Sequence, residues 1–264
     1  MSALLADGLF TAAIGFVAGL LSGAFGIGGG IVTTPALRLI LGAPALVAVG
    51  TPLPVIIPTA ITGAWSHHRN GTADVRAGVV MGIAGSLTAI LGAWATGLVG
   101  GSTVLIATAA LIVWSAGDMV LQALRPPVPP ASLGGAGEVA GRRTAGLIAV
   151  GLLTGLYSGF FGLGGGFVIV PLLTRWLHFS VKRAVGTSLV AVALLAVPGT
   201  VTHAVLGHVD WALAAALAVG VVPGALVGAH FVRQARDNTV RISFAVLLIV
   251  VALWLAVSEI VGLG

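Results

Sequence analysis

The stretches FGIGGG at residues 25–30 and FGLGGG at residues 161–166 interrupt two otherwise apolar regions of the chain. Each glycine costs a helix about 1 kcal/mol relative to alanine, so three in a row favour a break. About 15 apolar residues precede each glycine run and about 11 follow it, whereas a membrane-spanning helix needs about 20. We therefore expect two short helical arms joined by a glycine turn at each place.

The composition indicates an integral membrane protein. Of 264 residues, 58% are hydrophobic and 7% are charged, and the mean hydropathy is +1.15. A soluble domain carries about 25% charged residues, so this chain cannot cover its surface with charge. We expect an all-α polytopic membrane protein whose uninterrupted spanning helices lie near residues 44–66, 77–99, 103–124, 184–206, 211–232 and 242–262.

The two halves of the chain are copies of each other. GLLSGAFGIGGGIV at 19–32 aligns with GLYSGFFGLGGGFV at 155–168, and AVGT recurs at 48–51 and 184–187. The offset is 136 residues throughout, and residues 19–74 give 23 identities in 56 ungapped positions. We expect a first transmembrane repeat at 1–124, a Pro- and Gly-rich cytoplasmic linker at 125–143 and a second repeat at 144–264.

The basic residues decide between two topologies. If each glycine-interrupted region is a hairpin that returns to its own side, each half has three crossings and the second half is inverted. Eleven of the twelve Lys and Arg residues then share one side, with only Arg38 opposite. If each region crosses once, the division is seven to five. Because basic loops mark the cytoplasmic side, the sequence favours two inverted repeats, as in secondary transporters, with both termini outside.

The glycine tips are the candidate binding site. Irregular backbone at membrane depth is tolerated where it is buried in protein or lines a cavity, and each tip is followed by a helix whose N–H groups and dipole favour an anion. The alternative is that these glycines only permit close packing, which is how we interpret the spaced glycines of both copies. The candidate substrate-binding glycines are Gly28, Gly29, Gly30, Gly164, Gly165 and Gly166.

Hydroxyl groups near the tips are further candidates. Ser22 and Ser158 precede the tips, and Thr51 and Thr187 occupy equivalent positions early in the next helix of each copy. A hydroxyl can donate a hydrogen bond to an oxyanion without adding a fixed charge. The alternative for all four is a hydrogen bond to a carbonyl of their own helix.

Histidine and aspartate also recur in both copies. His67 and His203 are candidate gate or proton-carrying residues, because histidine titrates near neutrality; otherwise they are amphipathic helix-end residues. Asp74 and Asp210 are expected to cap the following helices. Asp118 lies within an apolar run and is interpreted as a partly hydrated residue near a helix end.

The pair GLLSGAFGIGGGIVTTPAL and GLYSGFFGLGGGFVIVPLL, followed by AVGTPL and AVGTSL, resembles the TauE/SafE family of sulfite exporters over essentially the whole chain. The resemblance implies a multi-pass permease of the bacterial cytoplasmic membrane. We accordingly expect a secondary transporter that exports a small sulfur-containing anion, either sulfite or an organosulfonate. An uptake permease or a passive channel for a related oxyanion, such as sulfate or thiosulfate, is the alternative.

Other classes of protein are disfavoured. The chain has no cysteine, which excludes disulfide scaffolds and thiolate metal sites, and its scattered basic residues do not form a nucleic-acid surface. An intramembrane serine protease could use Ser158 and His203, but Ser22 and His67 duplicate that pair in the other copy. We expect no enzyme activity, no cofactor and no metal; the partners are the anion and the lipid bilayer, and a homo-oligomer remains open.

Overall fold

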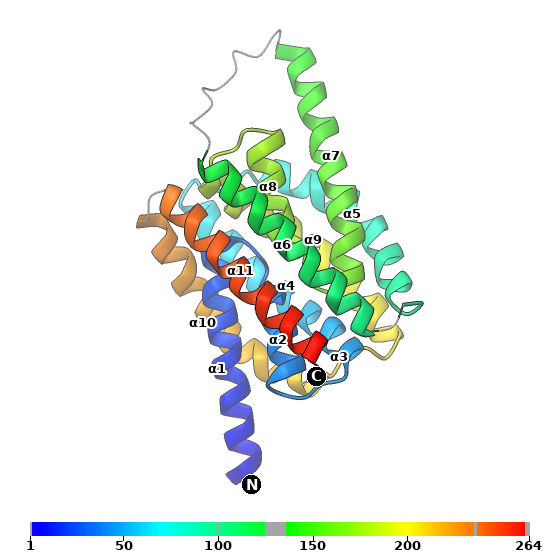
Figure 1. The fold of residues 1–264 in the computed structure, drawn as a ribbon. Coiled ribbons are helices and arrows are strands. Elements are labelled where there is room, and N and C mark those ends of the chain that lie inside the picture. Colours follow the sequence, from blue (N-terminus) through cyan, green and yellow to red (C-terminus); the bar gives the residue numbers. More distant parts are fainter. Residues whose placement is uncertain (1, 100, 125–135, 235–236, 262–264) are drawn as a thin grey trace.

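A computed structural model describes residues 2–99, 101–124, 136–234 and 237–261 (Figure 1). Every regular element in these ranges is a helix, so the predicted all-α class is confirmed there. The elements in chain order are α1 (Ser2–Phe25), α2 (Gly30–Leu39), α3 (Ala45–Gly50), α4 (Pro52–Arg69), α5 (Val75–Thr96), α6 (Gly101–Leu124), α7 (Ala136–Phe161), α8 (Gly166–Trp176), α9 (Val181–Val205), α10 (Trp211–Gln234) and α11 (Asp237–Val261).

The largest helix contacts join one half of the chain to the other. Helix α1 packs along α10, α7 along α5, α4 against α9 and α6 against α11. Under the 136-residue offset, the α1–α10 contact is the counterpart of the α7–α5 contact. The halves therefore form one interlocked body, and α6 and α11 run side by side on the face seen in Figure 1.

Small residues make the closest of these contacts. A Cβ added to a glycine in the stripe on α1 would overlap a backbone carbonyl of α10, and the stripe on α7 meets α5 in the same way. Removing the side chains lets the helix backbones approach, which is how membrane helices commonly associate. The packing role expected for the spaced glycines is thus confirmed for Gly15, Gly19, Gly23, Gly151, Gly155 and Gly159.

Six helical segments of the described chain are long and apolar enough to cross a membrane: 8–25, 45–69, 75–96, 143–161, 181–205 and 211–232. Large apolar side chains on their outer faces are exposed, among them Leu87 at 72%, Val219 at 72% and Val205 at 82%. A soluble protein rarely exposes so large an apolar surface. The chain is therefore a multi-pass membrane protein.

The arms before the glycine runs are longer than the sequence suggested. Helix α1 has 24 residues and α7 has 26, so the expectation that both are too short to span is wrong. Hydropathy placed their starts too late, because α7 includes AGEVAGRR at 136–143, which is rich in the good helix formers Ala, Glu and Arg. The rest of the expected linker, 125–135, lies outside the described residues.

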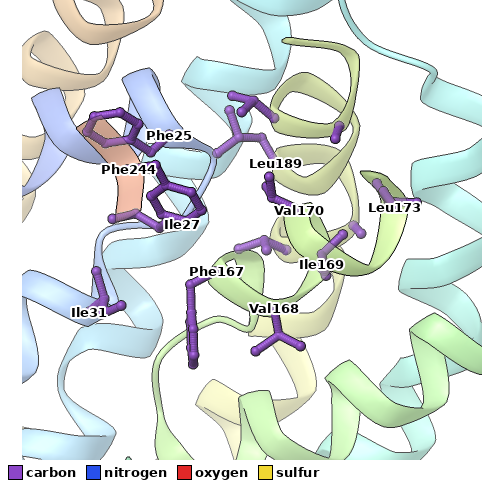
Figure 2. Close-up of a cluster of buried hydrophobic side chains, with 14 of the residues drawn as sticks. Phe25, Ile27, Ile31, Phe167, Val168, Ile169, Val170, Leu173, Leu189 and Phe244 are labelled. Carbon is purple, nitrogen blue, oxygen red and sulfur yellow. The ribbon is translucent and has the colours of Figure 1, made fainter. Parts of the chain in front are cut away.

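The largest buried cluster surrounds the two glycine runs (Figure 2). Phe25, at the end of α1, stacks on Phe244 of α11 with ring centroids 5.4 Å apart. Ile27, from the first run, and Phe167, at the start of α8, are each at most 1% exposed. The irregular backbone at 26–29 and 162–165 is therefore buried in protein and held on several sides by apolar side chains.

Candidate functional site

Two glycine loops connect α1 to α2 and α7 to α8. Gly29 and Gly165 cap the N-termini of α2 and α8 in the left-handed region, with φ of 88° and 73°. Non-glycine residues rarely adopt this conformation because their Cβ clashes with the backbone. The same holds for the other positive-φ loop residues, which are Gly26, Gly28, Gly162 and Gly164, while Gly30 and Gly166 are the first helical residues.

The two loops lie side by side in antiparallel directions. A Cβ on Gly30 would lie 2.8 Å from the backbone of Leu163, and one on Gly166 would overlap the carbonyl oxygen of Gly26 and lie 2.8 Å from Cα of Ile27. Residues 22–31 and 162–171 are buried without exception. The loops thus meet inside the molecule, and glycine is required where the two backbones touch.

Gly28 and Gly164 share one pair of apolar neighbours. A Cβ on Gly28 would lie 2.8 Å from Cγ1 of Val192 and 3.1 Å from Cγ2 of Ile56. A Cβ on Gly164 would lie 3.0 Å from Cδ1 of Ile56 and 3.3 Å from Cγ1 of Val192. Ile56 of α4 and Val192 of α9 are 136 residues apart, so they occupy equivalent positions in the two copies.

Each loop also faces a buried hydroxyl group that has no hydrogen-bond partner. Ser22 is 0% exposed and its Cβ lies 3.8 Å from the Cβ position of Gly29; Ser158 is 1% exposed and lies 3.3 Å from that of Gly165. Thr34, inside α2, is a third such residue. Buried polar groups are rarely left without a partner, and here two of them stand beside helix N-termini that carry unpaired N–H groups.

The threonine candidates have structural partners instead. The hydroxyl of Thr51 accepts a 3.0 Å hydrogen bond from the backbone N–H of Asp210, and that of Thr187 accepts one of 2.9 Å from Asp74. These bonds join the halves, since each threonine bonds the copy to which it does not belong. A hydrogen bond to the threonine's own helix was the alternative expected from the sequence; the bonds to the other copy are a third arrangement.

The histidine candidates are buried, so the expectation of amphipathic end residues is wrong. Nε2 of His67 lies 3.2 Å from the carbonyl oxygen of Gly23, and Nε2 of His203 lies 2.8 Å from that of Gly159. Each imidazole thus donates to a carbonyl in the last turn before its own half's glycine loop, where helical partners are lacking. On the other side, Nδ1 of His67 contacts Thr72 and Nδ1 of His203 contacts His208.

The histidines do not activate the serines. The Ser158 hydroxyl has no hydrogen-bond partner, and His203 Nε2 is taken by a backbone carbonyl. The same description holds for Ser22 and His67. A serine nucleophile needs a base within hydrogen-bond reach, which neither pair provides.

The acidic residues fall into two groups. Asp74 and Asp210 accept hydrogen bonds from the first N–H groups of α5 and α10, so the predicted capping is confirmed. Asp118 is 6% exposed and forms an ion pair with Arg175 at the end of α8. The expectation of a partly hydrated residue is therefore wrong for Asp118: its charge is compensated by an arginine that is distant in sequence.

The chain matches known proteins over nearly its whole length. The family model described as sulfite exporter TauE/SafE covers residues 11–255. The chain belongs to the TauE/SafE family. TauE/SafE relatives include the probable membrane transporter protein YunE of Bacillus subtilis, 29% identical over 90% of this chain and 93% of its own, and a probable membrane transporter protein of Xylella fastidiosa, 31% identical over 91% and 90%. No solved structure gives a significant match.

A TauE/SafE relative also occurs outside bacteria: the probable membrane transporter protein MJ0441 of Methanocaldococcus jannaschii is 25% identical over 92% of both chains. Membership of the TauE/SafE family makes this chain a membrane transporter.

Sequence reasoning missed three residues of the TauE/SafE loop region: Thr34, Ile56 and Val192. Thr34 has no polar counterpart in the second copy, which carries Val170 there. Ile56 and Val192 lack polar atoms and resemble their apolar neighbours in sequence. Their only signal was the repeat offset, which places them at equivalent positions in α4 and α9.

Proposed function

We propose that this transporter exports a small sulfur-containing anion, sulfite or an organosulfonate, across the bacterial cytoplasmic membrane. The observation that carries the proposal is the repeated pairing of an unpartnered buried serine with a glycine-capped helix N-terminus. Ser22 faces Gly29 and Ser158 faces Gly165. Hydroxyl and N–H groups together can bind an oxyanion without a lysine or arginine.

The arrangement of α1 and α7 supports two inverted re-entrant hairpins. Gly15, Gly19 and Gly23 lie beside Leu217, Val221 and Ala225, so α1 runs parallel to α10 and ends level with residue 227. Helix α10 continues to Gln234, about 10 Å further at 1.5 Å per residue. Figure 1 shows α1 entering from the lower end with α2 returning toward it, and α7 entering from the upper end with α8 returning upward.

Charge supports a cytoplasmic location for the upper end in Figure 1. Asp74, in the loop before α5, pairs with Arg143 of α7 at 3.3 Å and with Arg183 of α9 at 2.7 Å. Burial alone would raise the pKa of Asp74, but hydrogen bonds from the Ala77 N–H and from Arg183 lower it overall. Arg38 lies at the other end, near the carbonyl of Ala43. With the positive-inside rule, these contacts support our proposal that both termini lie outside.

Membrane voltage can drive the export of an anion. An inside-negative potential favours the exit of an anion by about 2.3 kcal/mol per charge per 100 mV. Export therefore needs no coupled ion. An uptake permease would need one, and a passive channel would show a conductance too large for an alternating-access cycle.

Transport by the purified protein tests the proposal. In proteoliposomes, efflux of sulfite is expected to accelerate when a potassium gradient with valinomycin makes the lumen negative. A Gly29→Leu/Gly165→Leu double variant should lose this flux because leucine at both caps blocks the two helix N-termini. The proposal is wrong if the wild-type protein moves neither sulfite nor a sulfonate, and the loop site is wrong if the double variant transports normally.

A further inference from the structure

Two apolar side chains occupy the space that the loop glycines leave open. Ile56 is 1% exposed and Val192 is 0% exposed, and both lie closer than ordinary van der Waals contact to the positions that Cβ atoms on Gly28 and Gly164 would occupy. Gly28 and Gly164 both adopt positive φ, at 77° and 76°. Backbone that is free of side chains offers its N–H groups to a ligand, and here the groups standing over it are these two side chains.

We propose that Ile56 and Val192 form the wall that limits the size of the anion, so that the wild-type protein selects inorganic sulfite over organosulfonates. The inference rests on the proposed function. Ile56 and Val192 fill the space next to Gly28 and Gly164, and in this proposal that is the space into which an alkyl substituent on the sulfur would extend. A site that binds through hydroxyl and N–H groups recognises the sulfur-bound oxygens, which sulfite and sulfonates share. The two substrate classes are then distinguished by the side chains around the position of the alkyl substituent.

The wall formed by Ile56 and Val192 lies against both glycine loops. Ile56 and Val192 occupy equivalent positions, and each contacts both Gly28 and Gly164. The wall is therefore shared by the two loops, in contrast to the serines, each of which faces only its own loop. Shortening either residue should widen the space at both loops.

The size of the effect follows from the chemistry of apolar pockets. One methylene group in such a pocket changes the selectivity of a site about 10- to 200-fold. Ile56→Ala removes three carbon atoms and Val192→Ala removes two. We expect each variant to raise the transport ratio of ethanesulfonate to sulfite at least about tenfold, and the double variant to raise it further.

The experiment measures that ratio in proteoliposomes, with sulfite and ethanesulfonate as competing substrates of the purified protein. A ratio does not depend on how much protein is folded, and Ile56→Val serves as a milder variant if Ile56→Ala does not fold. Leu217→Ala is the matched control, because Leu217 is fully buried in a different cluster, beside Gly15 of α1. It should leave the ratio unchanged.

The outcomes separate the two proposals. Transport of sulfite by the wild-type protein, with the same ratio in the Ile56, Val192 and Leu217 variants, overturns the wall and leaves the proposed function standing. A wild-type protein that already prefers ethanesulfonate also overturns the wall. Absence of any sulfite or sulfonate flux overturns the proposed function, and the wall with it.

Discussion

Ser22 and Ser158 are costly residues for a fold that does not use them. A buried hydroxyl without a partner costs about 1–3 kcal/mol of stability, and both serines are at most 1% exposed. Alanine fits the same space and has no polar atom. Equivalent positions in the two copies thus keep the same unfavourable group beside equivalent glycine caps, which is expected of a group that binds a ligand.

Replacing these serines should therefore separate stability from transport. Ser22→Ala and Ser158→Ala are each expected to leave the midpoint of thermal unfolding in detergent unchanged or raised, because an unsatisfied hydroxyl is removed. Each should also weaken sulfite binding about tenfold, the value of one lost hydrogen bond of about 1.4 kcal/mol. Thermal unfolding measures the effect on stability, and the dependence of proteoliposome flux on sulfite concentration measures the effect on binding. Ser86→Ala is the control, since its hydroxyl bonds Gly82 of its own helix; loss of stability without loss of affinity at Ser22 would contradict the assignment.

The helices that follow the two glycine loops, α2 and α8, are attached to their neighbours by different contacts. Helix α8 is fixed to α6 by a 2.7 Å hydrogen bond from the Ser115 hydroxyl to the Phe167 carbonyl and by the Asp118–Arg175 ion pair. The positions equivalent to Ser115 and Asp118 in the second copy are Val251 and Trp254, which cannot make these bonds. The polar attachment therefore exists for α8 and has no counterpart at the equivalent positions of α11, which pack beside α2.

Breaking the ion pair should loosen α8. Asp118→Asn removes the charge while keeping the shape, and we expect a loss of about 2 kcal/mol; fully buried pairs lose about 3–5 kcal/mol, but Arg175 is half exposed. Chemical unfolding in mixed detergent micelles measures the loss. The double variant Asp118→Asn/Arg175→Gln should recover part of it, because no charge is then left without its partner. If the double variant loses as much stability as the two single variants together, the ion pair contributes nothing.

Across the whole molecule, the sequence predicted the membrane class and the position of the glycine turns, while the division into two repeats stays a prediction. These follow from composition, the 136-residue offset and the poor helix propensity of glycine, all of which are local or periodic. The start of α7, the Asp118–Arg175 pair and the threonine bonds to Asp74 and Asp210 could not be predicted. Each depends on contacts between segments that are distant in the chain, and such contacts cannot be predicted from the sequence of either segment alone.

The orientation of the two halves is the remaining prediction at this scale. The loop after α4 lies at the start of α9, because Asp74 contacts Thr187 and Arg183, whereas residues 206–210 follow the end of α9. The 25 residues of α9 span about 37 Å, so equivalent loops of the two copies lie at opposite ends. In a membrane, Asn70 should then face the cytoplasm and Leu206, its equivalent, the exterior.

Single cysteines can test this arrangement directly, because the chain has none of its own. In intact cells, a membrane-impermeant maleimide is expected to label a Leu206→Cys variant, while an Asn70→Cys variant should react only after the membrane is opened. Sulfite flux of each variant in proteoliposomes verifies that it is folded. Labelling of both positions from the same side would mean that the halves are parallel and that each glycine-interrupted region crosses the membrane once. Labelling from opposite sides in the reverse sense would retain the inverted repeats but turn the basic end outward, which would contradict the cytoplasmic location proposed for that end.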